Sequence, residues 1–354
     1  MDAPKIAVLG AGVVGHTTAN IIQNELRGAN ITIIADKFKE NTTSAIAAGI
    51  FRPGTSFRGP TQDITQKWVN DSWYYWQDIL KSSESTNAGI MALSSYIYSK
   101  DNPQIARNHL LENLLPIYRS VTEDELTICP GNWKYGAFYS TVLIESNIHL
   151  PYIEQKFINN GGNILNENIA SFTSLAGRFD LIFNCTGLGA KILCNDHDLV
   201  PIRGQVIKVK APWLKTAFYG DYDTYVIPGF NGVATLGGTR QYDSYRLEYC
   251  RHDAAAIYER CVDLIPALKK AEVLSHKVGL RPHRTPVRVE PEFDSSGVKI
   301  VHCYGHGGYG VTCAPGTAMH AVNIGLNLLK SNFRNKFYTI YGIKTSHTVY
   351  MQTS

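Results

Sequence analysis

Three glycines near the start of the chain have the spacing of a phosphate-binding turn. Gly10, Gly12 and Gly15 follow an apolar run and open a helical pattern. Gly10 would permit the tight turn, Gly12 would let backbone amides reach a pyrophosphate, and Gly15 would let the helix lie close to the strand. The positive N-terminal end of the helix, at Val13 and Val14, would then face the phosphates. The pattern predicts a dinucleotide-binding turn.

A second glycine-rich segment lies near the other end of the chain. Residues 302–312 read His-Cys-Tyr-Gly-His-Gly-Gly-Tyr-Gly-Val-Thr. This composition indicates that the end of the chain folds back onto the same cofactor. A cofactor bracketed by both ends of its chain is more typical of a flavoenzyme than of an NAD dehydrogenase.

Asp36 is the candidate for the ribose-binding acid of this site. It ends a second apolar run, 31–35, at a distance from the glycine turn that suits such an acid. A carboxylate there would accept hydrogen bonds from ribose hydroxyls and would repel the 2′-phosphate of NADP. The alternative is a β-α-β unit that binds no ligand, but the succession of strand, glycine turn and helix favours a ligand.

Composition places the chain among ordinary two-domain globular proteins. It has 354 residues, of which 44% are hydrophobic and 18% charged, and a formal net charge of +4. That length allows two domains with substantial cores. No basic run with interleaved aromatic residues indicates nucleic-acid binding, and no apolar stretch reaches the length of a membrane span. The nucleotide-binding strand begins so early that we expect no signal peptide.

Cysteines and histidines give no sign of a disulfide framework or a metal site. The seven cysteines are scattered and form no C-x-x-C pair, which indicates reduced thiols in an intracellular protein. His302 and His306 stand four residues apart, a spacing that brings two imidazoles onto one metal only within a helix. We expect His302 in a strand and His306 in a glycine turn, so no metal site is predicted.

The remaining pattern predicts an interrupted nucleotide domain. Helices are expected over 16–23, 68–80, 143–157, 253–270 and 316–329, and strands over 6–9, 163–165, 179–184, 201–210, 224–240 and 298–304. The expected class is α/β, with a Rossmann-like domain made of 1–50, 140–195 and 298–340. A substrate-binding domain rich in antiparallel strands, made of 51–139 and 196–297, would be inserted into it.

Several segments, in their order and spacing, resemble the D-amino-acid oxidase and D-aspartate oxidase family of FAD enzymes. They are Thr42-Thr43 with Ala47-Ala48-Gly49, Pro201–Gln205, Tyr225–Gly229, Val278–Pro282 and Tyr304–Gly310. The resemblance covers essentially the whole chain and implies FAD as the cofactor. It places on FAD, besides the glycine turn, Asp36, Lys37, Thr43, Ser44, Ala48, Gly49, Ile50, Ile169, Thr186, Gly307, Gly308, Tyr309, Gly310, Val311 and Thr312.

The resemblance also implies how the substrate is held. Arg281 would bind its α-carboxylate with help from Tyr225, and the carbonyl of Gly308 would accept the α-amine. The chemistry of the two groups agrees with this role for Arg281. A guanidinium can donate two parallel hydrogen bonds to a carboxylate and so fix the direction of the Cα–H bond. Without the resemblance, Arg281 would be interpreted as a salt-bridge residue and Tyr225 as core. His306 is expected to form a local hydrogen bond within the glycine turn and not to act as a base.

Arg240 predicts an acidic substrate. In this family its Gly-Gly-Thr-Arg context is typical of the acidic-substrate branch, where the arginine takes the side-chain carboxylate, whereas the alternative is a guanidinium that points to solvent. Arg52 would add a further cation or gate the entrance together with Arg58. Tyr309, in contrast, follows the neutral-substrate pattern, and Asp221 stands where a lid tyrosine is expected.

The implied reaction is oxidative deamination of acidic D-amino acids, namely D-aspartate, with D-glutamate as a further candidate, ahead of a broad or neutral-substrate oxidase. Hydride transfer to FAD would give an imino acid that hydrolyses to a 2-oxo acid and ammonia, and dioxygen would become hydrogen peroxide; no general base is assigned. The other classes considered are a flavin dehydrogenase and a non-catalytic flavin-binding relative. A homo-oligomer is compatible with the family. The family is usually peroxisomal, whereas the chain ends at Ser354 without a Ser-Lys-Leu-type signal, so a cytosolic location stays open.

Overall fold

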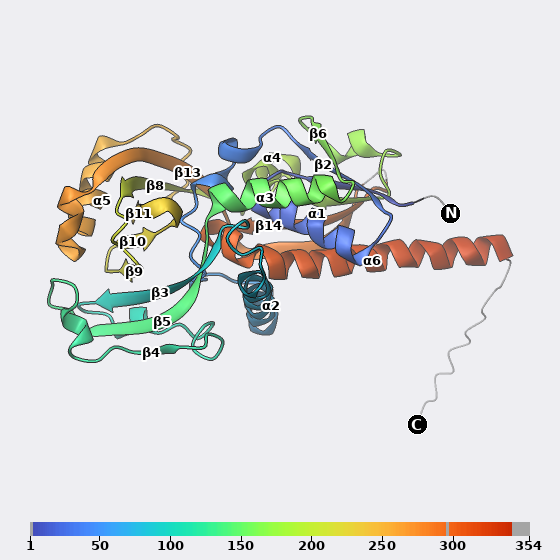
Figure 1. Ribbon diagram of the computed structural model, residues 1–354. Helices are drawn as coiled ribbons and strands as arrows, with labels where there is room; N and C mark the ends of the chain where they lie inside the picture. Colours follow the sequence, from blue (N-terminus) through green and yellow to red (C-terminus); the bar gives the residue numbers. More distant parts are fainter. Residues whose placement is uncertain (1–2, 295–296, 342–354) are drawn as a thin grey trace, which may run out of the picture.

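The computed structural model describes residues 3–294 and 297–341, and one long twisted sheet runs through them from end to end (Figure 1). Its strands follow the order β4-β5-β3-β9-β10-β11-β8-β13-β14-β7-β1-β2-β6, with β12 paired to β8. One half of this sheet is parallel and carries helices, and the other half is largely antiparallel. The structure thereby confirms the expected α/β class.

The parallel half contains the two glycine motifs. Its strands are β14 (Lys299–His306), β7 (Leu181–Asn184), β1 (Lys5–Leu9), β2 (Asn30–Ala35) and β6 (Asn163–Asn166). Alternate residues of β1 enter two different cores: Ile6 and Val8 pack with the helices, and Ala7 and Leu9 pack on the opposite face. Burial on both faces explains why this strand is apolar throughout.

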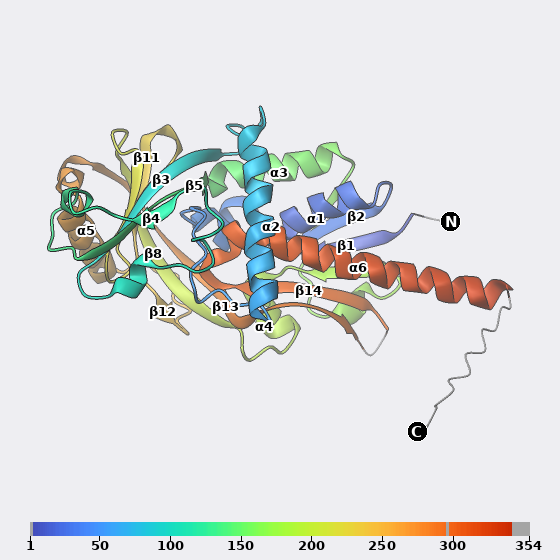
Figure 2. The ribbon, with the colours of Figure 1, turned by 90° about the horizontal axis from the view of Figure 1, so that it is seen from below.

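Helices cover the first of these faces. Helix α1 (Val13–Glu25) packs between α3 (Ser146–Asn159) and α6 (Gly310–Tyr341), and α2 (Gln62–Lys81) crosses α6 (Figure 2). No helix in the described ranges is both long enough and apolar enough to cross a membrane. The opposite face is covered in part by a short 3-10 helix, Phe172–Leu175.

The largely antiparallel half is built from strands distant in the sequence. They are β3 (Ile90–Ser99), β4 (Tyr118–Ser120), β5 (Tyr135–Ile144), β8 (Val200–Lys210), β9 (Thr216–Tyr219), β10 (Tyr225–Pro228), β11 (Val233–Gly237), β12 (Gln241–Tyr242) and β13 (Glu272–Phe293). Helix α5 (Arg251–Leu264) packs on β8 and β11. The short α4 (Ala190–Leu193) follows the end of β7.

Strand β13 joins the two halves. It pairs with β8 over Glu272–His283 and with β14 over His283–Phe293, with a register irregularity between His283 and Arg288. The cofactor-side motif on β14 and the Gly-Leu-Arg-Pro motif on β13 are therefore held in one hydrogen-bonded register.

Several predicted element boundaries were wrong. The helix expected from Leu143 begins at Ser146, because Leu143 still pairs with Met91 as part of β5. The helix expected over 253–270 ends at Leu264, and a 3-10 helix with Pro266 near its start follows it. Strand β14 continues to His306, so that histidine lies in the strand and not in the turn. The domain boundaries stay a prediction.

Candidate active site

A cavity of about 920 Å³ lies where the parallel and antiparallel halves meet. It opens at the carboxyl ends of the parallel strands, which is where α/β sheets bind their ligands. Every residue predicted to contact FAD lines it except Gly15, namely Gly10, Gly12, Val13, Val14, Asp36, Lys37, Thr43, Ser44, Ala48, Gly49, Ile50, Ile169, Thr186 and Gly307–Thr312. The predicted substrate residues Arg52, Tyr225, Arg240, Arg281 and Gly308 line the same cavity.

The glycine turn between β1 and α1 is as tight as its sequence predicts. Gly10 has φ 102°, and a Cβ there would lie 2.5 Å from the carbonyl oxygen of Cys185. Gly15 serves packing instead of lining the cavity, because a Cβ there would overlap the carbonyl oxygen of Gly10. Both glycines therefore bring α1 close to the sheet, and its first residues face the cavity.

Loop 42–50 closes over the N-terminus of α1. The backbone N–H of Val13 donates to Ser44 Oγ at 3.0 Å, and the Thr43 hydroxyl donates to the carbonyl oxygen of Leu280 at 3.2 Å. These two bonds link the start of α1, the hydroxyl-rich loop and β13. The loop is thus fixed at the place where small residues let a cofactor approach the backbone.

Asp36 directly follows β2 at the rim of the cavity. Within the described part of the chain its carboxylate has neither a hydrogen bond nor an ion pair, and the same holds for the neighbouring Lys37. Position and chemistry fit an acceptor for ribose hydroxyls.

The second glycine motif contributes the start of another helix. After β14, a 3-10 turn at Gly307–Tyr309 leads into α6, whose first residues line the cavity. His306 bonds Thr317 of α6, with 2.8 Å between Nε2 and Oγ1, so the prediction of a partner within the turn was wrong. Burial lowers the pKa of His306 to about 4, which keeps this ring neutral near pH 7.

Arg281, on β13, presents an oriented guanidinium to the cavity. One guanidinium nitrogen, Nη1, donates to the carbonyl oxygen of Thr239 at 2.9 Å, and no carboxylate pairs with Arg281 in the described residues. The guanidinium lies over Gly204, a diagonal neighbour on β8, where any side chain would displace it. A Cβ at Gly308 would be 3.5 Å from Arg281 Cδ, so the terminal motif adjoins the same arginine.

Tyr225 stands beside Arg281. Its ring covers Gly237, which lies directly opposite in the β10–β11 pair, and Gly238. Burial raises the pKa of Tyr225, against the opposing effect of the Arg281 cation, so the phenol keeps its proton and can donate it in a hydrogen bond. The Gly-Gly pair of the Gly-Gly-Thr-Arg motif is therefore explained by the space that this ring needs.

Arg240 lies at the mouth of the cavity and already has a partner. Its Nε is 2.9 Å from Asp223 Oδ1, and the two side chains are 46% and 39% exposed. Burial alone would lower the pKa of Arg240, but Asp223 and Tyr309 more than offset it. The side chain is thus neither fully solvated nor without a carboxylate partner.

Arg52 differs from Arg240 in its surroundings. Its Cζ lies 4.7 Å from the ring centroid of Tyr219. In the described residues it has no hydrogen bond and no acidic partner. Burial alone would lower its pKa, but four surrounding tyrosines, Tyr139, Tyr219, Tyr118 and Tyr309, raise it. Arg58, the predicted companion in gating, is exposed and does not line the cavity.

The loop between β9 and β10 forms one wall of the mouth. Asp221, which stands where a lid tyrosine was expected, accepts hydrogen bonds from Ser99 Oγ at 2.7 Å and from the Lys100 N–H at 3.0 Å. It therefore anchors the loop to the end of β3. Sequence reasoning missed Asp223 and Tyr219 as neighbours of the two arginines, because nothing in their local sequence marks those contacts.

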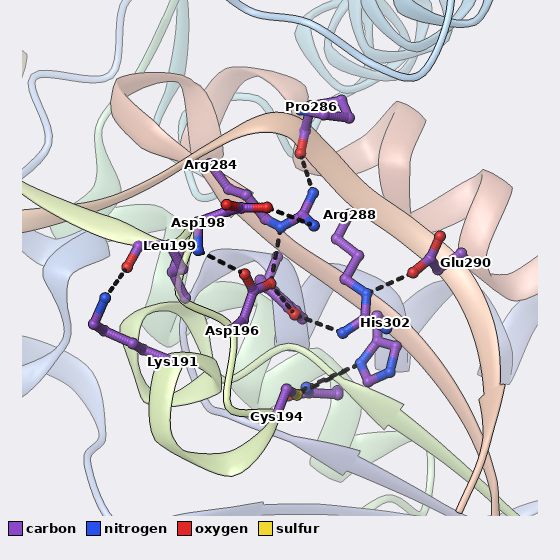
Figure 3. Close-up of polar contacts among 12 residues, drawn as sticks. Lys191, Cys194, Asp196, Asp198, Leu199, Arg284, Pro286, Arg288, Glu290 and His302 are labelled. Carbon is purple, nitrogen blue, oxygen red and sulfur yellow. Dashed lines mark hydrogen bonds and ion pairs between the residues drawn. The ribbon is translucent and has the colours of Figure 1, made fainter.

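A dense polar network surrounds residues 191–199, which follow the Cys185–Gly189 turn in the chain (Figure 3). Arg284 Nε is 2.8 Å from Asp196 Oδ2, which also accepts the Tyr304 hydroxyl at 2.6 Å. Arg288 pairs with Glu290 and Glu292, each at 2.6 Å. The network ties the segment after β7 to β13 and β14, and so fixes one side of the cavity.

The fold and this cavity define an FAD-dependent oxidoreductase. The sequence profile of the family described as FAD dependent oxidoreductase matches residues 5–324, and the chain belongs to that family. This confirms the resemblance and FAD as the cofactor. The tight glycine turn, the accessible start of α1 and the unpaired Asp36 all fit that cofactor.

Individual relatives agree over nearly the whole chain. Human D-aspartate oxidase is 36% identical over 329 residues, covering 92% of this chain and 95% of that protein. The D-amino acid oxidase of Dugesia ryukyuensis is 33% identical over 321 residues, covering 88% and 95%. Among solved structures, glycine oxidase from Bacillus cereus ATCC 14579 superposes with a TM-score of 0.77 at 15% identity, covering 92% of this chain and 98% of that one.

Proposed function

We propose that the protein oxidises acidic D-amino acids, D-aspartate first and D-glutamate as a further candidate, to the 2-oxo acid, ammonia and hydrogen peroxide. The observation that carries the proposal is the guanidinium of Arg281, which lacks a carboxylate partner in the described residues and shares its cavity with the dinucleotide-binding turn. Two further guanidinium groups, Arg240 and Arg52, line the same cavity and supply cations for a second carboxylate. The similarity to human D-aspartate oxidase supports this substrate class.

When bound, FAD supplies the two-electron oxidation of the substrate Cα–N bond and the transfer of those electrons to dioxygen. The residues of the chain position the substrate for it. Arg281 takes the α-carboxylate through a charge-assisted fork, Tyr225 adds a hydrogen bond from its neutral phenol, and the carbonyl of Gly308 accepts from the amine. Orientation is the contribution of these groups, so no side chain is assigned as a general base.

The proposal also assigns each part of FAD to a segment of the chain. The glycine turn and α1 hold the pyrophosphate, Asp36 holds the ribose, and loop 42–50 with the Gly307–Thr312 segment holds the rest of FAD. We also propose the division into a cofactor domain (1–50, 140–195 and 298–340) and a substrate domain (51–139 and 196–297). A peroxisomal location is proposed with the cytosol as the alternative; the C-terminal tetrapeptide that bears on it lies outside the described residues.

A neutral-substrate oxidase is the second candidate, and the Arg240–Asp223 ion pair favours it. A guanidinium already neutralised by a carboxylate attracts a substrate anion less than an unpaired one. The similarity to the D-amino acid oxidase of Dugesia ryukyuensis, 33% identical, is compatible with an acidic or a neutral substrate for this chain.

The first test is anaerobic reduction of the bound flavin, followed by its absorbance, with D-aspartate, D-glutamate, D-alanine and L-aspartate. We expect rapid bleaching by the two acidic D-isomers and none by L-aspartate. Bleaching mainly by D-alanine would move the protein to the neutral class. Oxygen consumption with stoichiometric peroxide separates an oxidase from a dehydrogenase, and a flavin that no D-amino acid bleaches would indicate a non-catalytic relative.

A further inference from the structure

The Gly-Gly-Thr-Arg motif contains a β-bulge at one edge of β8. Strand β8 pairs with β11 as far as Gly237, which stands opposite Val206, and with β12 from Gln241, which stands opposite Arg203. Between these two pairs, three residues (238–240) face only two residues of β8 (204 and 205). One extra residue of this kind bends the strand and redirects its backbone groups.

Thr239, in the middle of the bulge, makes two different contacts. Its hydroxyl accepts the backbone N–H of Gln205 at 2.9 Å, in place of the ladder acceptor that the bulge displaces. Its carbonyl oxygen accepts a hydrogen bond from Arg281 Nη1, also at 2.9 Å. One residue therefore ties the edge of β8 to the guanidinium that we assign to the α-carboxylate.

The guanidinium of Arg281 reaches Thr239 by crossing β8. Arg281 stands opposite Ile202 in the β8–β13 pair, on the edge of β8 away from the bulge. Its guanidinium lies over Gly204, which has no side chain to block it, and meets Thr239 at the other edge. An arginine side chain has several rotatable bonds, so a contact at its far end fixes the plane in which it offers parallel N–H groups to a carboxylate.

The far side of the bulge is held by Arg203, the buried arginine of the Pro201–Gln205 segment. Arg203 is only 1% exposed, and its guanidinium donates five hydrogen bonds, which is its full capacity. The acceptors lie at 2.7 to 3.1 Å and are side-chain oxygens of Gln205, Gln241 and Asp253 and carbonyl oxygens of Arg246 and Glu248. Gln241, which closes the bulge, is thereby fixed beside Thr239.

We propose that Thr239 is a positioning residue for the carboxylate site: its hydroxyl holds the bulge against Gln205, and its carbonyl thereby sets the orientation of Arg281. The inference rests on the proposed function, in which Arg281 binds the α-carboxylate, and deepens it. It also gives a role to the Pro201–Gln205 segment, which supports the bulge from β8. Because acidic and neutral amino acids share the α-carboxylate, loss of the Thr239 hydroxyl affects both alike.

The test uses the FAD-loaded full chain and compares Thr239→Val with Thr239→Ser. Valine keeps the shape of threonine but lacks the hydroxyl, so we expect kcat/KM for D-aspartate and for D-alanine to fall about tenfold, with KM raised and kcat lowered. Serine keeps the hydroxyl and should recover most of the loss. Steady-state oxygen consumption measures both constants.

Thr235→Val is the matched control. Thr235 is buried on β11, accepts a hydrogen bond from Lys208 Nζ at 2.7 Å and does not line the cavity. Removing this hydroxyl should lower Tm and leave kcat/KM within about twofold of the parent. Thermal unfolding of each variant shows whether it is folded, and Thr239→Ala removes the same hydroxyl should Thr239→Val fail to fold.

A second measurement does not depend on turnover. Sodium acetate, as a probe of the α-carboxylate site, is titrated into the oxidised enzyme in a calorimeter. The Kd of acetate should rise about tenfold in Thr239→Val and stay within about twofold of the parent in Thr239→Ser and Thr235→Val. A residue that only stabilises the fold would lower Tm without this change in Kd.

The outcomes separate this inference from the proposed function. If no D-amino acid is oxidised but acetate binding weakens in Thr239→Val and not in the control, the oxidase function fails and the role of Thr239 stands. If D-aspartate is oxidised and Thr239→Val matches the parent, or Thr235→Val shows the same loss, the role of Thr239 is overturned and the function stands. A change confined to Tm in Thr239→Val overturns that role as well.

Discussion

Two groups of arginines differ in their surroundings, although three of the four, Arg281, Arg284 and Arg288, lie on β13. In the network of Figure 3, Arg284 and Arg288 each have a carboxylate within 2.8 Å. On the cavity wall, Arg281 and Arg52 have no carboxylate partner in the described residues. Arg284 and Arg281 are three residues apart in the chain, so local sequence does not distinguish them.

The difference separates arginines whose charge is paired with a carboxylate of the fold from arginines whose charge has no such partner. A buried cation that finds its anions within the fold is a structural connection, because removing either partner leaves the other uncompensated. A cation on a cavity wall without such an anion is stabilised only when a ligand brings one. Charge imbalance in a cavity is therefore a better sign of a binding residue than the presence of arginine itself.

The largest effect should come from the unmatched Arg281. Arg281→Met removes the α-carboxylate site, and we expect kcat/KM for every D-amino acid to fall by about 1000-fold or more, since a buried charge–charge contact and its orientation are lost together. Steady-state oxygen consumption measures this. Flavin content should be unchanged, and normal turnover in this variant would rule out the assigned role.

In the network of Arg284 and Arg288, where each charge has a carboxylate partner, a substitution should lower the stability of the fold. Asp196→Asn leaves Arg284 largely buried without its main partner, and we expect the free energy of unfolding to fall by about 3 kcal/mol. Denaturant unfolding monitored by circular dichroism measures the change. Glu290→Gln, at a 55% exposed partner of Arg288, is the control and should cost less than about 1 kcal/mol. A large loss of substrate affinity with unchanged stability would contradict the comparison.

Buried histidines occur in both regions and predict the response to acid. Burial lowers the pKa of His302, in the network, and of His306, on the cavity wall, each to about 4. The unfolded chain, with an ordinary histidine pKa near 6.5, binds these protons first as pH falls. Stability is therefore fully present above about pH 6.5 and is lost as pH falls from there towards 4. Thermal unfolding across this range should show a smaller slope in His306→Asn than in the parent.

The smallest effect should come from removing the carboxylate partner of Arg240. Asp223→Asn releases that guanidinium, and we expect KM for D-aspartate to change by no more than about threefold, because exposed ion pairs contribute little. The loop it holds should become more mobile, which limited proteolysis near Tyr222 would detect. A tenfold fall in KM would instead indicate that Asp223 competes with the substrate for Arg240.

The cofactor half could be predicted from sequence because its signals are local. Gly10, Gly12 and Asp36 lie within one β-α-β unit, and the fold places them where their spacing indicates. Element ends were less predictable: Leu143 stays in β5 through its pairing with β3, and His306 stays in β14 and bonds Thr317. Such contacts depend on other strands and helices.

In the largely antiparallel half, the arginines that line the cavity were predictable but their partners were not. Arg281, Arg240 and Arg52 were identified, whereas Asp223 and Tyr219 were not, because these neighbours come from another part of the sheet. The contact between Tyr225 and the Gly237–Gly238 pair is likewise invisible until the β10–β11 register is known.

Strand β13 is shared by the two halves of the sheet and sets the spacing between residues on either side. Its pairing with β8 and β14 sets how far Arg281 lies from the cofactor motif. Because side chains alternate along a strand, a single-residue insertion between Gly279 and Arg281 would turn the arginine to the opposite face. Replacing wall residues such as Arg52 would therefore change what this cavity accepts, whereas the distance from Arg281 to the cofactor motif would still be set by β13.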